Sequence, residues 1–186
     1  MRKRVAPCSM AMMLLVCLCL PAGGIRAEVL SSSPYGFLVK SGVRVGDVPG
    51  RVYEALVDRI GEWWDPQHTF SGDARNLSLE ARPGGCFCED LPCGGGVRHM
   101  EVVFVAPDSV LRVTGALGPL QGSGLAGSMT WSFRREGDST AAELTYGVGG
   151  YFEGDLAKAA AAVDAVLGAQ LLRLKACVEG KKAGYD

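Results

Sequence analysis

Two histidines and one nearby acid are the residues of this sequence best suited to acid–base chemistry. His99 and Glu101 lie two positions apart in a stretch that predicts a strand, so their side chains are expected on one face. If that face lines a cavity, the pair could act as acid and base, because each group and its burial would tune the other. The alternative is a polar pair facing solvent, since apolar residues occupy both faces of this strand. His68 is the only other histidine, and no G-x-S-x-G nucleophile elbow is present.

Aromatic and polar side chains supply the candidate ligand contacts. Trp63 and Trp64 end a predicted helix just before Phe70, and adjacent helical residues point about 100° apart, so we expect only one tryptophan to face the interior fully. These aromatics could form core packing or the wall of a binding site. Arg112 and Tyr146 would orient a ligand carboxyl or hydroxyl if they face a cavity, and Tyr146 is also a third acid–base candidate. The full set of predicted ligand contacts is Trp63, Trp64, Phe70, Arg112, Trp131, Tyr146 and Asp164.

Three cysteines form a cluster with the spacing Cys86-x-Cys88-x4-Cys93. The spacing contains no C-x-x-C pair and does not match a zinc site, so no metal is predicted. Cys86 and Cys88 share a face of a predicted strand but are too awkwardly adjacent to bridge easily. We therefore expect Cys93, in the following Gly-rich turn, to form a disulfide with Cys88 or Cys86.

A glycine-rich segment over residues 122–127 fits the G-x-G-x-x-G pattern. That pattern binds a dinucleotide only when a helix N-terminus follows it, and here a predicted strand follows instead. The segment is therefore interpreted as a mobile loop at the rim of a cavity. No cofactor is predicted.

Hydrophobic periodicity predicts one strand, one helix, six further strands and a long C-terminal helix. The expected strands cover residues 36–45, 76–81, 86–89, 97–105, 110–117, 128–134 and 141–148. Apolar residues at three- and four-residue spacing predict helices from residue 47 to 64 and from 156 to 178. Each helix has one apolar stripe to bury, which favours an α+β fold with a curved antiparallel sheet of about seven strands wrapped around the long C-terminal helix.

Several short motifs resemble the START-like superfamily, also called SRPBCC or Bet v 1-like. They are Glu54-Ala55-Leu56 running to Trp63-Trp64, Arg82-Pro83-Gly84-Gly85 before a short strand, and Leu111-Arg112-Val113-Thr114-Gly115. Together they look like the subgroup of heat-shock-protein ATPase activator homologues and polyketide cyclase/dehydrase proteins. The resemblance covers residues 36–178 and implies a helix-grip fold with a cavity for an apolar small molecule between the sheet and the long helix. It carries over no catalytic residues.

The N-terminus has the three regions of a secretory signal. Basic residues 2–4 precede an apolar stretch from 10 to 20 and small residues that end at Ala27. Residues 1–27 are therefore expected to be a signal peptide, cleaved after Gly24 or Ala27, with an uncleaved anchor as the alternative. The stretch is about half the length of a spanning helix, so no permanent membrane span is expected. Residues 28–35 are interpreted as a lead-in and residues 179–186 as a polar tail.

The charge balance excludes one large class of partner. Nineteen basic and twenty acidic residues give a net charge of −1, so nucleic acid is not an expected partner. We expect a secreted or periplasmic protein, monomeric or weakly dimeric, that binds a small hydrophobic or amphipathic molecule. An exported chain would not meet a cytosolic chaperone ATPase. The alternative functions are an enzyme of the polyketide cyclase or dehydratase type and an interaction module with a filled interior.

Overall fold

A computed structural model describes residues 25–181, which form one antiparallel sheet with helices on one face. The strands follow the order β1-β2-β8-β7-β6-β5-β4-β3 across the sheet. Their bounds are Arg26–Ser33 (β1), Gly36–Val45 (β2), Leu77–Leu79 (β3), Cys86–Leu91 (β4), Gly95–Ala106 (β5), Val110–Thr114 (β6), Gly124–Glu136 (β7) and Ser139–Tyr151 (β8). The predicted α+β, helix-grip architecture is confirmed, with eight strands in the sheet.

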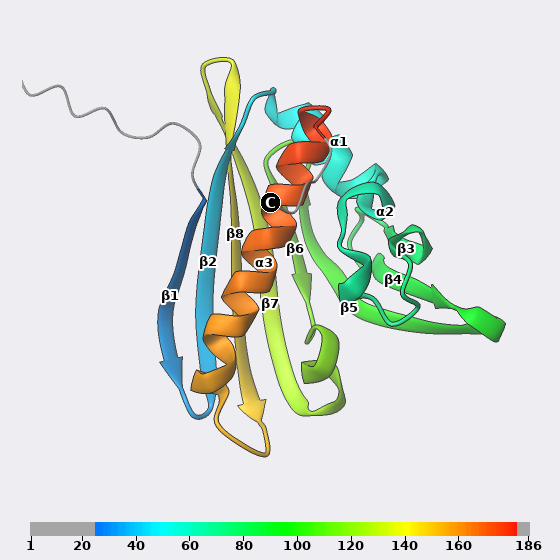
Figure 1. Cartoon of the computed structure of the whole chain (residues 1–186), viewed down its shortest axis with the longest axis vertical. Helices are drawn as coiled ribbons and strands as arrows, with labels where there is room; N and C mark the ends of the chain where they lie inside the picture. The colour runs from blue at the N-terminus through cyan, green and yellow to red at the C-terminus, as the bar shows by residue number, and fades with distance from the viewer. Residues whose placement is uncertain (1–24, 182–186) are drawn as a thin grey trace, which may run out of the picture.

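Three α-helices lie on the inner face of this sheet. They are α1 (Pro49–Asp58), α2 (Ile60–Trp63) and the long α3 (Leu156–Val178). In Figure 1, α3 runs across β2, β8 and β7, while α1 and α2 cover the part of the sheet toward β3 and β4. Among residues 25–181, no helix has both the length and the apolar character needed to cross a bilayer.

The inner face is built by strict alternation along the strands. In β2 the buried residues begin with Phe37 and Val39 and recur at every second position through Val45. In β8 alternate residues such as Leu144 and Tyr146 are buried in the same way. These rows pack against the apolar stripe of α3 in one core, which fixes which side chains can reach the interior.

The segment expected to be a lead-in is instead the edge strand β1. It pairs antiparallel with β2 from Arg26↔Gly42 to Ser33↔Gly36. Every one of its residues is exposed, so the strand has no apolar alternation by which to recognise it. The predicted signal peptide lies mostly outside the described residues, but Arg26 and Ala27 belong to this strand.

The first helical region breaks and turns just before Trp64. Helix α2 ends at Trp63, and Trp64 has extended backbone angles (φ −63°, ψ 142°). This change of direction brings both indole rings inside, with exposed fractions of 2% and 6%. The expectation that only one tryptophan faces the interior is therefore wrong, because it assumed that the helix continues through both positions.

Candidate functional site

An apolar cavity of about 660 Å³ lies between the sheet and the first half of α3. Its helical wall includes Ala159, Val163 and Val166 of α3. Across from them, the segment after α2, which contains the short helix η1 (Pro66–His68), contributes residues 67–70. The floor comes from the sheet, and the short helix η4 (Gly118–Gly122) with the residue before it supplies part of the rim.

Five residues singled out from the sequence line this cavity: Trp64, His68, Phe70, His99 and Tyr146. They come from three parts of the fold, namely the segment after α2, β5 and β8. Leu117 and Leu120 also line the cavity. The glycine-rich segment expected at the rim mostly enters β7, so the residues just before it form the rim instead.

The remaining predicted contacts point elsewhere. Trp63 and Trp131 are buried in the core and do not line the cavity. Asp164 is buried on α3, one position beyond the lining residue Val163, where it accepts a hydrogen bond from Ser41. The predictions that place these three side chains against the cavity are therefore wrong. Trp131 faces the core from β7, a strand that contributes no residue to the lining, and the indole of Trp63 donates to the carbonyl of Ala55 in α1.

Arg112 lies on the outer face of the sheet. Its guanidinium donates to Thr130 Oγ1 at 3.0 Å and stands 5.5 Å from the ring centre of Phe104. Both partners are on neighbouring strands of the same face. The prediction that Arg112 faces the cavity is wrong, since even positions of β6 point outward.

A β-bulge separates His99 from Glu101. Phe87 pairs with Met100 and Cys88 with Arg98, so His99 is an extra residue in β5. The bulge turns His99 to the inner face, where it is 5% exposed, while Glu101 stays outside in an ion pair with Arg98. The predicted His99–Glu101 pair is therefore wrong, because a bulge changes the parity on which the shared face depended.

Glu89, on the adjacent strand β4, is the acid that His99 does contact. Its carboxylate has no exposed side-chain area and lies 2.9 Å from His99 Nε2. The same carboxylate accepts hydrogen bonds from the backbone N–H groups of Phe70 and Ser71. Burial alone raises the pKa of Glu89, but the hydrogen bonds from Ser71, Phe70 and His99 outweigh it and lower the pKa below its ordinary value.

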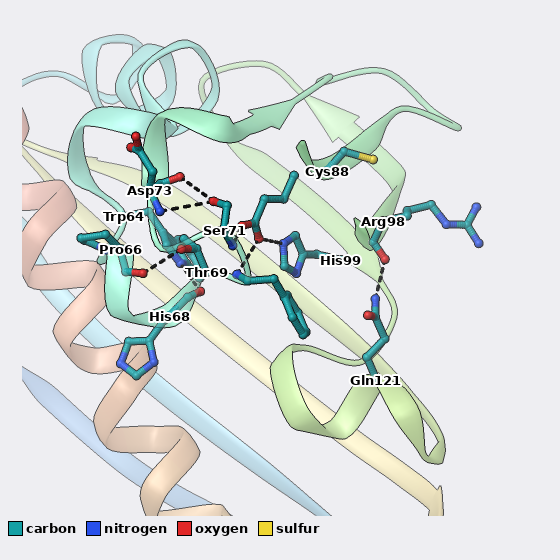
Figure 2. A network of polar contacts seen from close by, with 12 residues as sticks. Trp64, Pro66, His68, Thr69, Ser71, Asp73, Cys88, Arg98, His99 and Gln121 are labelled. Carbon is teal, nitrogen blue, oxygen red and sulfur yellow. Dashed lines mark hydrogen bonds and ion pairs between the residues drawn. The ribbon is translucent and has the colours of Figure 1, made fainter. Parts of the chain in front are cut away.

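The imidazole of His99 is held between two aromatic rings. The ring centres of Phe87 and Phe70 lie 5.1 Å and 5.8 Å from it. Figure 2 shows His99 facing the segment that carries Thr69 and Ser71. Because Glu89 binds both the histidine and that segment, it fixes the cavity wall and the imidazole together.

Further hydrogen bonds hold the same segment in place. Trp64 Nε1 donates to the carbonyl of His68 at 3.1 Å, and Thr69 Oγ1 donates to the carbonyl of Pro66 at 2.7 Å. The backbone N–H of Asp65 donates to Gln170 Oε1 of α3 at 2.9 Å. The cavity wall opposite α3 is therefore held by hydrogen bonds to α3, to β4 of the sheet and within the segment.

Tyr146 lines the cavity from β8 with a fully buried side chain. Its oxygen accepts a hydrogen bond from the backbone N–H of Leu117 at 3.1 Å. Burial raises the pKa of Tyr146 to about 12, against the opposing effect of that hydrogen bond. The phenol therefore keeps its proton at neutral pH and can donate it to a bound molecule.

The disulfide joins Cys86 to Cys88, and Cys93 is free and exposed in the hairpin turn. The predicted bond to Cys93 is wrong. The Cα atoms of Cys86 and Cys88 are 5.3 Å apart, closer than the roughly 6.6 Å between alternate residues of an extended strand. That separation lies within the range that a disulfide needs, and the register of β4 against β5 shifts beside Cys88. Phe87, between the two cysteines, faces the cavity.

Alternation along β4 already places Glu89 on the same face as Phe87, so the sequence held a signal for it. What the sequence did not show was the bulge that turns His99 toward it. Within the described residues, no three His, Cys, Asp or Glu side chains gather as metal ligands would.

Comparison with solved structures identifies the fold. CalU16 from Micromonospora echinospora matches with a TM-score of 0.54 and 14% identity over 84% of each chain. The Aha1 dimer from Colwellia psychrerythraea matches with a TM-score of 0.55 and 18% identity over 78% of this chain and 98% of that one. DynU16, from the dynemicin biosynthetic locus, gives a TM-score of 0.53 and 22% identity over 80% of this chain and 50% of its own. No family model matches, and a search of curated sequences found no match.

These likenesses confirm the predicted helix-grip fold. At these identities they establish the fold alone, so the function has to be argued from the cavity.

Proposed function

We propose that this START-like chain binds a small hydrophobic or amphipathic molecule in the cavity between its sheet and α3. The observation that carries the proposal is the cavity itself, with about 660 Å³ of space and a mostly apolar lining. Sites for small molecules commonly have about 300–1,000 Å³ and a few polar groups in an apolar wall. Here His99 and Tyr146 are such polar groups.

Aromatic side chains strengthen the case for an apolar ligand. Trp64, Phe70, Phe87 and Phe152 all line the cavity. Phe70 lines the cavity and is still 55% exposed, so a ligand that fills the cavity would remove more of its ring from solvent. Burial of apolar surface at about 25 cal/mol per Å² is the driving force that such a ligand would use.

Export of the protein remains part of the proposal. The basic, apolar and small-residue regions of residues 1–27 support it. Outside the cytosol the protein would carry or sense its ligand as a monomer or weak dimer.

A pair of tryptophan substitutions on α3 tests the proposal. Val163→Trp adds a large side chain at a position that lines the cavity, and Ala165→Trp adds the same side chain at an exposed position two residues on. We expect the unmodified chain and Ala165→Trp to bind anilinonaphthalene sulfonate by calorimetry, and Val163→Trp to bind it at least about tenfold more weakly. Equal affinity in the three proteins would show that the dye does not occupy this cavity. No binding to any of them would contradict the proposed function.

A further inference from the structure

We propose that His99 is a general base for the bound molecule, with Glu89 as its positioning residue, and that the ligand is an apolar carbon acid such as a ketone or enone. The inference rests on the proposed function, because it requires a ligand in the cavity. It adds a reaction to that binding role.

The contacts of His99 leave one ring nitrogen available to a ligand. Nε2 lies 2.9 Å from the Glu89 carboxylate. Nδ1 has no hydrogen-bond partner among residues 25–181. It also keeps some solvent-accessible area, because the only fully buried side-chain atoms without a partner in this part of the chain belong to Tyr53 and Gln170. The histidine lines the cavity, so the free nitrogen is accessible there.

The carboxylate determines which proton the imidazole carries. An ionised Glu89 accepts a hydrogen bond, so in the neutral imidazole the proton lies on Nε2 and the lone pair on Nδ1. When Nδ1 takes up a second proton, the buried negative charge of Glu89 stabilises the imidazolium. The arrangement is that of a base oriented and supported by a carboxylate.

A purely structural role does not account for all of these features. Glu89 already anchors the cavity wall through Phe70 and Ser71, and that function needs no histidine. His99 reaches the interior only because of a bulge in β5, and bulges are over-represented beside active sites. The bulge places a titratable ring against an apolar cavity and leaves one nitrogen unpaired.

Tyr146 supplies the complementary group. Its oxygen accepts from Leu117 N–H, so its own O–H remains free to donate to a ligand oxygen in the same cavity. In the proposed step the C–H bond beside a carbonyl breaks and the proton moves to His99 Nδ1. The electron pair forms an enolate, whose oxygen accepts the Tyr146 hydrogen bond. In a β,γ-unsaturated ketone the electron pair is shared with the γ carbon, so return of the proton to that carbon moves the double bond, completes an isomerisation and restores both residues, with no oxidant or cofactor.

Nitrobenzisoxazole is a suitable probe because its ring opening needs only a base. The base removes the ring C–H proton, the electron pair forms the nitrile, and the N–O bond breaks to release a coloured phenolate. We expect the chain to catalyse this reaction, and His99→Gln to lower the rate about 100-fold, within the usual contribution of a general base. Glu101→Gln, which changes an outward carboxylate on the same strand, should leave the rate unchanged. His68→Ala, which removes the other cavity histidine, should lower the rate much less than His99→Gln does.

The pH dependence of the rate separates positioning from folding. The titratable side chains that line the cavity are His68, His99 and Tyr146, with Glu89 behind His99. The rate should rise with pH, because only a base that has lost its proton can accept one from the probe. In Glu89→Gln that rise should move to lower pH, because a neutral amide cannot balance the positive charge that the base gains in the reaction. A merely structural role for Glu89 would lower the folded fraction without moving the profile.

Binding of the probe is followed in the same samples through the fluorescence of Trp64, and folding through near-UV circular dichroism. Bound probe without turnover above the His99→Gln level would overturn the catalytic role and leave the proposed function intact. So would a rate that depends on His68 instead. If His99→Gln does not fold, the pH profiles of the unmodified chain and Glu89→Gln decide, and identical profiles overturn the inference. If neither nitrobenzisoxazole nor anilinonaphthalene sulfonate binds, both proposals fail together.

Discussion

Replacing Glu89 with alanine should destabilise the chain more than any comparable change to a surface acid. The substitution removes the acceptor for Phe70 N–H, Ser71 N–H and His99 Nε2, in a side chain with no exposed area. Hydrogen bonds to a charged group contribute about 1.5–3 kcal/mol each, so losing three of them at a buried site should cost at least about 3 kcal/mol. Glu101→Ala, which removes an ion pair with Arg98 at the surface, should cost less than about 1 kcal/mol.

The assay is equilibrium unfolding by urea at neutral pH, followed by tryptophan fluorescence. Trp64 lies in the segment that Glu89 anchors, so its fluorescence reports on the structure of that segment as well as on unfolding of the whole chain. Equal free energies of unfolding for Glu89→Ala and Glu101→Ala would refute the assignment of Glu89 as the anchor of the cavity wall.

The same carboxylate predicts a pH dependence with a definite sign. The pKa of Glu89 is lowered from an ordinary value of 4.5, so the folded chain binds this proton more weakly than the unfolded chain. The stabilisation is therefore fully present well above pH 4.5 and is lost as the pH falls through the lowered value. The difference in unfolding free energy between the unmodified chain and Glu89→Gln should shrink over that interval. A constant difference would contradict the hydrogen-bond pattern.

Three further predictions concern a glycine, the cysteines and the N-terminus. Gly127→Ala should destabilise the chain by about 1–3 kcal/mol in thermal unfolding, because the added Cβ would lie 2.6 Å from the Gly115 carbonyl and 2.9 Å from the Tyr146 ring. The control Gly122→Ala should be tolerated, since its Cβ would meet nothing within 4 Å. Equal losses of stability in the two variants would contradict this packing. Thiol titration of the unreduced, unfolded mature chain should find two free thiols, and four would show that the disulfide is absent. N-terminal sequencing of the exported protein should give residue 25 as the first residue. Cleavage there keeps all of β1, which starts at Arg26, and keeps Ile25, whose side chain lies 3.0 Å from the position of a Cβ built on Gly168 of α3. A first residue of Glu28 would contradict this prediction.

The sequence was informative wherever burial follows a regular period. Alternation identified the inner rows of β2 and β8, and three- and four-residue spacing identified α3, because each of these elements buries one face. The edge strand β1 escaped prediction since all of its residues are exposed and no apolar pattern marks it. It is recognised only through its pairing with β2.

Periodicity predicted only part of the candidate site. Trp64, Phe70 and Tyr146 were identified as candidate contacts and do line the cavity. The acid–base pair was mispaired because a single inserted residue in β5 reversed the side on which His99 points. Local alternation carries no signal for a bulge, which depends on the register of the neighbouring strand.

The disulfide was mispaired for a related reason. Two cysteines separated by one residue of a regular strand lie roughly 6.6 Å apart, at the upper end of the range for a disulfide, whereas the Cα atoms of Cys86 and Cys88 are 5.3 Å apart. The register shift between β4 and β5 therefore lies beside both the disulfide and the inward-facing histidine.

Native mass spectrometry of the protein purified from its own source tests the central claim most directly, with Val163→Trp and Ala165→Trp prepared alongside. An occupied cavity predicts a discrete additional mass on the unmodified chain and on Ala165→Trp. The same mass should be lost from Val163→Trp and recovered by organic extraction of the other two. A ligand-free spectrum for all three proteins, together with no calorimetric binding of an apolar dye, would contradict the claim that this cavity is a binding site.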